Sequence, residues 1–126
     1  MTASGARADQ SLEGEAPAAS EEVEAVLAAL ADPTRRQLLD LLVTAREASA
    51  STLAGRLPVS RQAVVKHLQI LEAAGLAEGS RAGREVLYTA RRDALDASAR
   101  WLTSLSAAWE QRLSALKRAA EAATSD

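Results

Sequence analysis

Apolar residues recur with a helical period over most of this chain. Four of them within residues 21–30 fall at i, i+3, i+4 and i+7 and predict the apolar face of a first helix: Val23, Val26, Leu27 and Leu30. Asp32 is a favourable N-cap and Pro33 suits a first helical position, so a second helix should begin here. It should end before the polar stretch 44–48, and its broad apolar face consists of Leu38, Leu39, Leu41 and Leu42.

Two capped helices separated by a tight turn follow. Ser49 can cap a short third helix that ends before Pro58 and whose inward positions are Leu53, Ala54 and Leu57. Ser60 can cap a fourth helix that runs to about Ala74 and ends at Gly75, a favoured C′ residue. A short helix, a tight turn and a longer capped helix are typical of a helix-turn-helix.

The apolar period changes from helical to alternating after Gly75. Residues 76–80 and 85–90 predict two short strands joined by residues 81–84, where Gly83 supplies the positive φ of a tight hairpin. A long amphipathic helix should start near Asp93, with apolar positions at Leu95, Ala99, Leu102, Leu105, Trp109, Leu113, Leu116 and Ala120. We therefore predict a mainly α fold with a β-hairpin wing, a winged helix-turn-helix of about five helices and two short strands.

The expected folded domain covers residues 21–120. Residues 1–20 have almost no large apolar side chains, which predicts a disordered acidic tail, and we expect residues 121–126 to be flexible.

The formal net charge of −2 conceals a basic middle segment. Met1–Pro33 holds one basic and seven acidic residues, Thr34–Arg92 holds ten basic and five acidic, and Asp93–Asp126 holds four basic and five acidic. The middle segment can therefore attract a polyanion although the whole chain is acidic.

Cysteine is absent from the sequence and His67 is its single histidine, so disulfides, zinc fingers and thiol nucleophiles are excluded. A metal site usually needs several ligands, and no nucleophile has a base and an orienting group nearby in the chain. We expect no enzyme, metal or cofactor. The apolar runs are too short to span a bilayer and the N-terminus has no signal pattern, so we expect a cytoplasmic protein without a membrane partner.

The fourth helix combines an apolar face with a polar one. Val64, Leu68 and Leu71 should face the core. The candidate DNA-binding residues lie on the opposite side and at the helix start: Ser60, Arg61, Gln62, Val65, Lys66 and Gln69. Arg and Gln pair bidentately with guanine and adenine, and Val65 could pack on a thymine methyl. The alternative is a solvated polar face. For His67 the alternatives are a phosphate contact and a partly buried surface histidine.

Three pairs of arginines lie outside this helix. Arg81 and Arg84 in the hairpin could contact a phosphate backbone or a minor groove, or could serve only for solubility. The same alternatives hold for the pair Arg91 and Arg92. Arg35 and Arg36 open the second helix at its positive dipole end, which either phosphate binding or a salt bridge to the acidic first helix would explain.

The first and last helices each have an apolar stripe that a domain this small does not obviously cover. We expect these stripes to form a homodimer interface, whose residues are Val23, Val26, Leu27, Leu30, Leu102, Leu105, Trp109, Leu113 and Leu116. The alternative is that the two helices pack against each other within one chain.

Three segments together carry a family resemblance: ALADPTRRQLLDLL, LAGRLPVSRQAVVKHLQILEAAGL and GREVLYTA. They resemble the ArsR-type winged-helix transcriptional repressors over about residues 23–116. The segment WLTSLSAAWEQRL is similar to the subgroup with a Trp-rich terminal helix and no metal site.

The resemblance implies a homodimer that binds operator DNA and blocks transcription, often of its own operon. It assigns residues 60–74 as the recognition helix and 76–90 as the wing. The motifs of the metal-sensing members are missing here. Two residues depart from the family pattern: Pro58 stands where Gly is common, and Val65 where a polar residue is common.

Our leading hypothesis is a dimeric repressor of a pseudo-palindromic operator in double-stranded DNA, released by a non-metal signal. The alternative is a winged-helix protein-interaction module that does not bind DNA. An unidentified small-molecule effector near Trp101 and Trp109 is a third hypothesis, which is compatible with the first.

Overall fold

The computed structural model describes residues 14–124 of the 126-residue chain. Its elements are α2 (Glu21–Leu30), α3 (Pro33–Ala45), β1 (Ala48–Ser49), α4 (Ala50–Ala54), α5 (Arg61–Ala73), β2 (Ala77–Ala82), β3 (Glu85–Ala90) and α6 (Asp93–Thr124). The predicted mainly α fold with a β-hairpin wing is confirmed. Residues 1–13 of the expected tail and residues 125–126 lie outside the described residues, and residues 121–124 continue α6 as helix.

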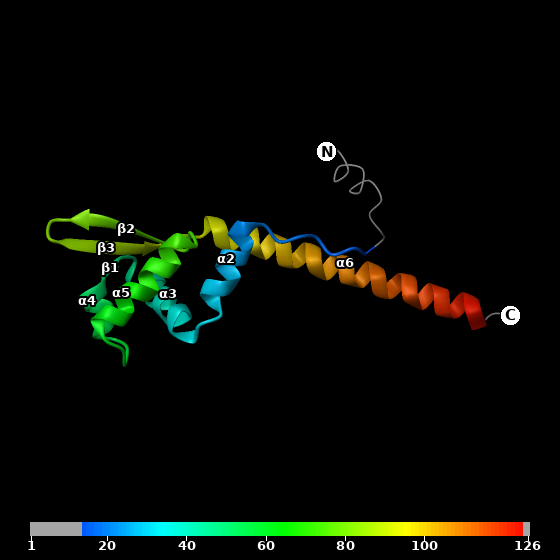
Figure 1. Ribbon diagram of the computed structural model, residues 1–126, viewed down its shortest axis with the longest axis horizontal. Helices are drawn as coiled ribbons and strands as arrows, with labels where there is room; N and C mark the ends of the chain where they lie inside the picture. The colour runs from blue at the N-terminus through cyan, green and yellow to red at the C-terminus, as the bar shows by residue number, and fades with distance from the viewer. Residues whose placement is uncertain (1–13, 125–126) are drawn as a thin grey trace. The chain divides into compact units, whose positions relative to one another are not determined.

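The chain divides into two compact units. One is Ala19–Ala99, and the other combines Met1–Ala18 with Arg100–Asp126. Within the first unit, α3, α4 and α5 gather on one side of the hairpin formed by β2 and β3 (Figure 1).

Side-chain caps set the starts of four helices. Ser20, Asp32, Ser49 and Ser60 each accept a hydrogen bond of 3.1 Å from the backbone N–H three residues on. Each cap satisfies a donor that the helix itself cannot pair and contributes about 1 kcal/mol. The caps predicted at Asp32, Ser49 and Ser60 are confirmed.

The end of α5 is a Schellman motif at Gly75. The Leu76 N–H donates to the Leu71 carbonyl at 2.9 Å, and the Gly75 N–H donates to the Glu72 carbonyl at 3.0 Å. Gly75 has a φ of +78°, where a side chain is strained. This reversal directs the chain from α5 into β2.

The sheet contains one strand more than predicted. Its order is β1-β3-β2, and all pairings are antiparallel. The two-residue strand β1 pairs Ala48 with Tyr88 and was not foreseen, because two residues are too few to show an alternating pattern. The hairpin loop is also shorter than expected, since Ala82 pairs with Glu85 and only two residues connect the strands.

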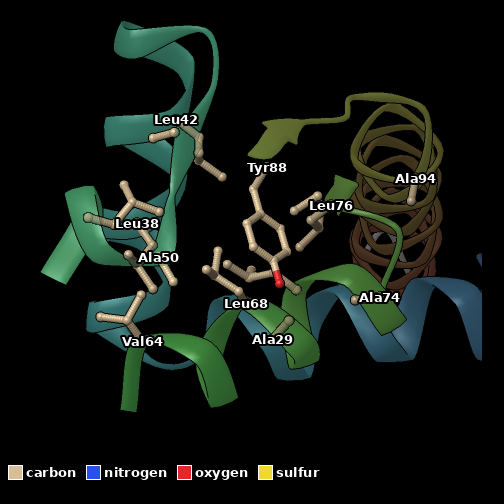
Figure 2. Packing of buried hydrophobic residues seen from close by; sticks show 14 of the residues in the cluster. Ala29, Leu38, Leu42, Ala50, Val64, Leu68, Ala74, Leu76, Tyr88 and Ala94 are labelled. Atoms are coloured by element: carbon tan, nitrogen blue, oxygen red, sulfur yellow. The ribbon is translucent and has the colours of Figure 1, made fainter. Parts of the chain in front are cut away.

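The core of the first unit lies between the helices and β3. Figure 2 shows the Tyr88 ring extending toward Leu68 and Leu76, with Leu38 and Leu42 nearby. All four leucines are at most 1% exposed, and Tyr88 is 9% exposed. The face predicted for the second helix is therefore confirmed at Leu38 and Leu42, whereas Leu39 and Leu41 are only partly buried.

In the second unit, α6 is accompanied by an extended segment. The Trp101 Nε1–H donates to the Pro17 carbonyl at 3.1 Å. Gly14 is buried, and a Cβ on it would lie 2.7 Å from the Ala108 carbonyl oxygen. No helix within residues 14–124 is long and apolar enough to cross a membrane.

We expect Gly75→Ala to lower the free energy of unfolding by about 1–2 kcal/mol, because alanine is disfavoured at positive φ. The new Cβ would also lie 3.2 Å from the Ala94 Cβ. Gly55→Ala is the matched control, since Gly55 has a φ of −72° and room for a Cβ. Urea unfolding of both variants at one protein concentration checks this, and equal losses would contradict it.

Candidate DNA-binding surface

Helix α5 separates its apolar and polar side chains onto two faces. Val64, Leu68 and Leu71 are fully buried in the core. The opposite face, which we call the reading face, consists of Arg61, Gln62, Val65, Lys66 and Gln69. Its four polar members are exposed and Val65 is half-buried. Together with Ser60 and Ala63, these residues line a shallow hollow along the first turns of the helix.

A second hollow lies between α5, α4 and the hairpin. Arg61 and Val65 contribute to it from α5, and the remaining lining residues are Ser49, Ala50, Ser51, Arg84, Glu85, Val86 and Tyr88. The Arg61 Nε–H donates to the Ser51 Oγ at 2.9 Å, which connects the start of α5 to α4. Ser51 was not among the predicted site residues, because a hydroxyl ten residues before Arg61 gives no periodic signal.

The wing presents its arginines to solvent. Arg81 on β2 and Arg84 in the turn are both exposed. Gly83, before Arg84, has a φ of +66°, which the two-residue turn of the hairpin requires. Both side chains are therefore accessible from solvent.

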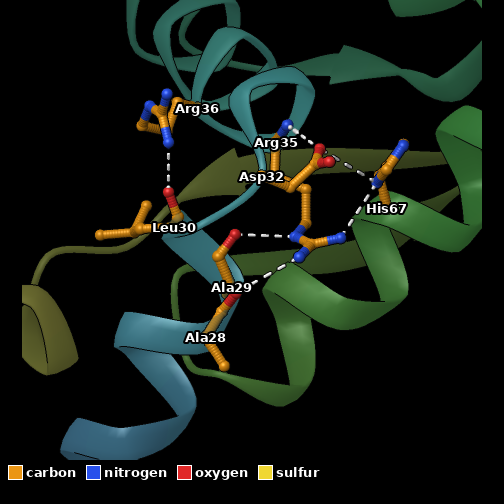
Figure 3. A network of polar contacts seen from close by, with 7 residues as sticks. All are labelled: Ala28, Ala29, Leu30, Asp32, Arg35, Arg36 and His67. Carbon is orange, nitrogen blue, oxygen red and sulfur yellow. Dashed lines mark hydrogen bonds and ion pairs between the residues drawn. The ribbon is translucent and has the colours of Figure 1, made fainter.

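The arginines that open α3 bind backbone carbonyls, which neither of the two alternatives for them had named. Arg35 donates from Nε to the Ala29 carbonyl at 2.7 Å and from Nη2 to the Ala28 carbonyl at 3.3 Å (Figure 3). Arg36 donates to the Leu30 carbonyl at 2.6 Å. Both side chains bind the last carbonyls of α2, where cations are favoured, rather than the carboxylates of that helix. These hydrogen bonds give both arginines a role at the corner between α2 and α3.

His67 belongs to the same corner. Its Nδ1 lies 3.4 Å from Nη1 of Arg35 and 3.9 Å from Oδ2 of Asp32, and its side chain is 22% exposed. Of the two alternatives for His67, the partly buried histidine describes this arrangement better.

Ion pairs neutralise the two arginines after the wing. Arg91 lies 3.1 Å from the Glu78 carboxylate and 3.6 Å from that of Asp93. Arg92 lies 3.6 Å from the carboxylate of Asp96. Both side chains therefore have acidic partners within the first unit.

The residues expected at a dimer interface differ in how much surface they retain. On α2, Val23 and Val26 are buried, Leu30 is half-buried and Leu27 is 38% exposed. Val26 and Leu30 pack within the core of the first unit and offer a partner little. Of the expected interface residues on α6, Leu105 is half-buried, whereas four are exposed: Leu102, Trp109, Leu113 and Leu116.

No group of three or more potential metal ligands occurs among residues 14–124. The first unit instead offers guanidinium, ammonium and amide donors on one helix face, beside a hairpin with exposed arginines. A helix of this kind fits the major groove of B-DNA, and its donors match the edges of bases. The fold and this surface define a winged helix-turn-helix protein of the DNA-binding class.

Comparisons with known proteins agree with this class. A helix-turn-helix domain family matches residues 30–79. The transcriptional repressor SdpR of Bacillus subtilis is 32% identical over 77 residues, which are 61% of this chain and 84% of SdpR. An ArsR-like transcriptional regulator from Rhodococcus sp. RHA1 superposes with a TM-score of 0.75 at 48% identity, over 80% of this chain and 92% of that one.

A third similar structure is the homodimeric winged helix-turn-helix DNA-binding domain of Mb0332 from Mycobacterium bovis, a fragment of residues 1–100. It has a TM-score of 0.55 and 27% identity, over 68% of this chain and 84% of that one. The chain belongs to the ArsR family of helix-turn-helix transcriptional regulators. It is thus a DNA-binding regulator. This membership does not favour the alternative of a winged-helix interaction module that does not bind DNA.

We expect Arg35→Met to lower the free energy of unfolding by about 1–3 kcal/mol, because it removes charge-assisted hydrogen bonds to the carbonyls of α2. Arg36→Met, at an exposed position, should cost less. The dependence of DNA affinity on salt should stay unchanged in both variants. A shallower salt slope with normal stability would instead identify Arg35 as a phosphate contact.

Proposed function

We propose that the protein is a homodimeric repressor that binds a pseudo-palindromic operator through two α5 helices. The observation that carries the proposal is the exposure of the reading face. The opposite side of α5 is buried in the core, and the reading face therefore points toward solvent. Half-sites about 10 bp apart would place the two helices in successive major grooves on one side of the duplex. Repression is supported by the similarity to the repressor SdpR.

The polar side chains of the reading face have distinct proposed roles. Arg61 and Gln62 would pair with base edges, since Arg61 can donate two hydrogen bonds at once and Gln62 can donate one while it accepts another. Lys66 and Gln69, one or two turns further along, would contact bases or the adjacent backbone. Ser60 and the free N–H groups at the start of α5 would bind a phosphate. From the wing, Arg84 and Arg81 would add phosphate contacts.

The apolar stripe of α6, defined as Leu102, Trp109, Leu113 and Leu116, is proposed as the main dimer contact. These residues repeat at i, i+7, i+11 and i+14 and share one helix face. All four are between 48% and 66% exposed, and a second copy would bury them. The homodimeric state of the Mb0332 domain supports this assignment.

Regulation is proposed to respond to a non-metal signal, and the repressor would act on its own operon. The sequence has no cysteine and one histidine, which leaves few soft or imidazole ligands for a metal. A small molecule bound near Trp101 and Trp109 would quench their fluorescence and release the DNA.

We expect Arg61→Ala and Gln62→Ala each to weaken operator binding by about 1–3 kcal/mol and to relax base preference at one position. Arg84→Ala should weaken binding to all sequences and make the salt slope shallower by about 1, because it removes a phosphate contact. Selecting duplexes from a random pool, then titrating them at two salt concentrations, checks both effects. Unchanged affinity after the joint loss of Arg61, Gln62 and Lys66 would refute the reading face.

We expect Leu113→Glu to shift the protein from dimer to monomer, because it places a charge in an apolar interface. Ser114→Glu is the matched control, since it adds the same charge to the same helix at an exposed position outside the stripe. Sedimentation equilibrium of both variants measures the change. A Leu113→Glu protein that remains dimeric would show that another surface forms the dimer.

A further inference from the structure

The side chain of Arg61 is fixed at one end only. Its Nε–H donates to the Ser51 Oγ at 2.9 Å, and this is its only hydrogen bond within residues 14–124. The residue is otherwise exposed, at the first position of α5. The two terminal nitrogens of the guanidinium therefore keep their donors for a ligand.

This single bond changes what Arg61 can recognise. A free arginine loses up to about 2 kcal/mol of rotamer entropy when it is ordered on DNA. Once Ser51 holds Nε, the guanidinium plane is already restricted, and the pair Nη1 and Nη2 remains as a fork. Two neighbouring acceptors match such a fork, and among the base edges of the major groove the O6 and N7 atoms of guanine supply them.

Val65 lies beside this fork on the same face of the helix. Residues at i and i+4 are neighbours on an α-helix, and both Arg61 and Val65 line the two hollows of the surface. Val65 is half-buried and packs on the core, so its position is fixed as well. Its exposed part offers an apolar contact, and in the major groove the 5-methyl group of thymine is the matching apolar feature.

We propose that Ser51 is a positioning residue for Arg61, and that the fixed Arg61 together with Val65 reads a guanine adjacent to a thymine. This inference rests on the proposed function, because it needs α5 in the major groove. It goes beyond it by assigning a role to a residue of α4 and by naming the base step. It also gives a reason for an apolar residue in the reading face.

The test begins with a 30-bp duplex that the full-length wild-type protein selects from a random pool. In that duplex each guanine of the half-site is replaced in turn by 7-deazaguanine, which lacks the N7 acceptor. We expect the replacement of one guanine to lower the affinity of the wild-type protein roughly 5- to 100-fold. The same replacement should not lower the affinity of the Arg61→Ala variant. Replacing the neighbouring thymine by uracil should weaken wild-type binding about fourfold and leave Val65→Ala unaffected.

Variants of Ser51 then separate positioning from general stability. The quantity compared is the affinity for the guanine duplex divided by the affinity for the 7-deazaguanine duplex. Ser51→Ala should lower this ratio at least about threefold, so that it approaches the ratio of Arg61→Ala. The salt slope of DNA binding should not change. Ser51→Thr keeps the hydroxyl and should keep the ratio. Ser104→Ala, at an exposed serine on α6, is the control and should behave as wild type.

The outcomes distinguish the two levels of the proposal. If no duplex is selected, the proposed function itself fails. If a duplex is selected but no guanine of the half-site depends on Arg61, or if Ser51→Ala keeps the wild-type ratio, DNA binding stands and the role of Ser51 is overturned. A uracil substitution without effect beside the critical guanine would overturn the role of Val65.

Discussion

The burial of Val64, Leu68 and Leu71 determines the direction in which the rest of α5 faces. All three are fully buried, and burying each contributes about 1.5–3 kcal/mol. Rotating the helix by one residue, or 100°, would expose part of this set and bury a charged neighbour, which is costly. The reading face is therefore a consequence of the packing opposite it, and its polar residues need no contact with the protein to stay exposed.

The corner between α2 and α3 shows how local electrostatics can accommodate cations at a helix start. Arg35 and Arg36 stand at the positive end of α3, where cations are disfavoured. Their side chains are long enough to reach back to the last carbonyls of α2, which are at a negative helix end. The two arginines are thus unfavourably placed in α3, but their side chains cap the end of the preceding helix α2. The corner also meets α5, because Arg35 lies 3.4 Å from His67.

The sequence predicted those features that depend on neighbouring residues. Caps at Asp32, Ser49 and Ser60, the end at Gly75 and the long helix from Asp93 follow from local chemistry or period, and the structure confirms them. Strand β1 could not be predicted, since two residues have no period and their partners, Tyr88 and Leu87, are far along the chain. The contacts of Arg35 with His67 and of Arg61 with Ser51 were missed for the same reason. Each of these contacts joins two helices, and the relative placement of the helices depends on the whole fold and not on the local sequence.

Helix α5 and the wing are held together at the base of the hairpin. The Gly79 N–H of β2 donates to the Glu72 carboxylate near the end of α5 at 3.2 Å, and Gly75 turns the chain between these two residues. At the other end of the helix, Arg61 is bound to Ser51 of α4. With both ends fixed, a phosphate contact by Arg84 would also restrict how α5 can slide along a groove. Backbone contacts of the wing, which read no base themselves, would thereby set the register in which the reading face meets the bases.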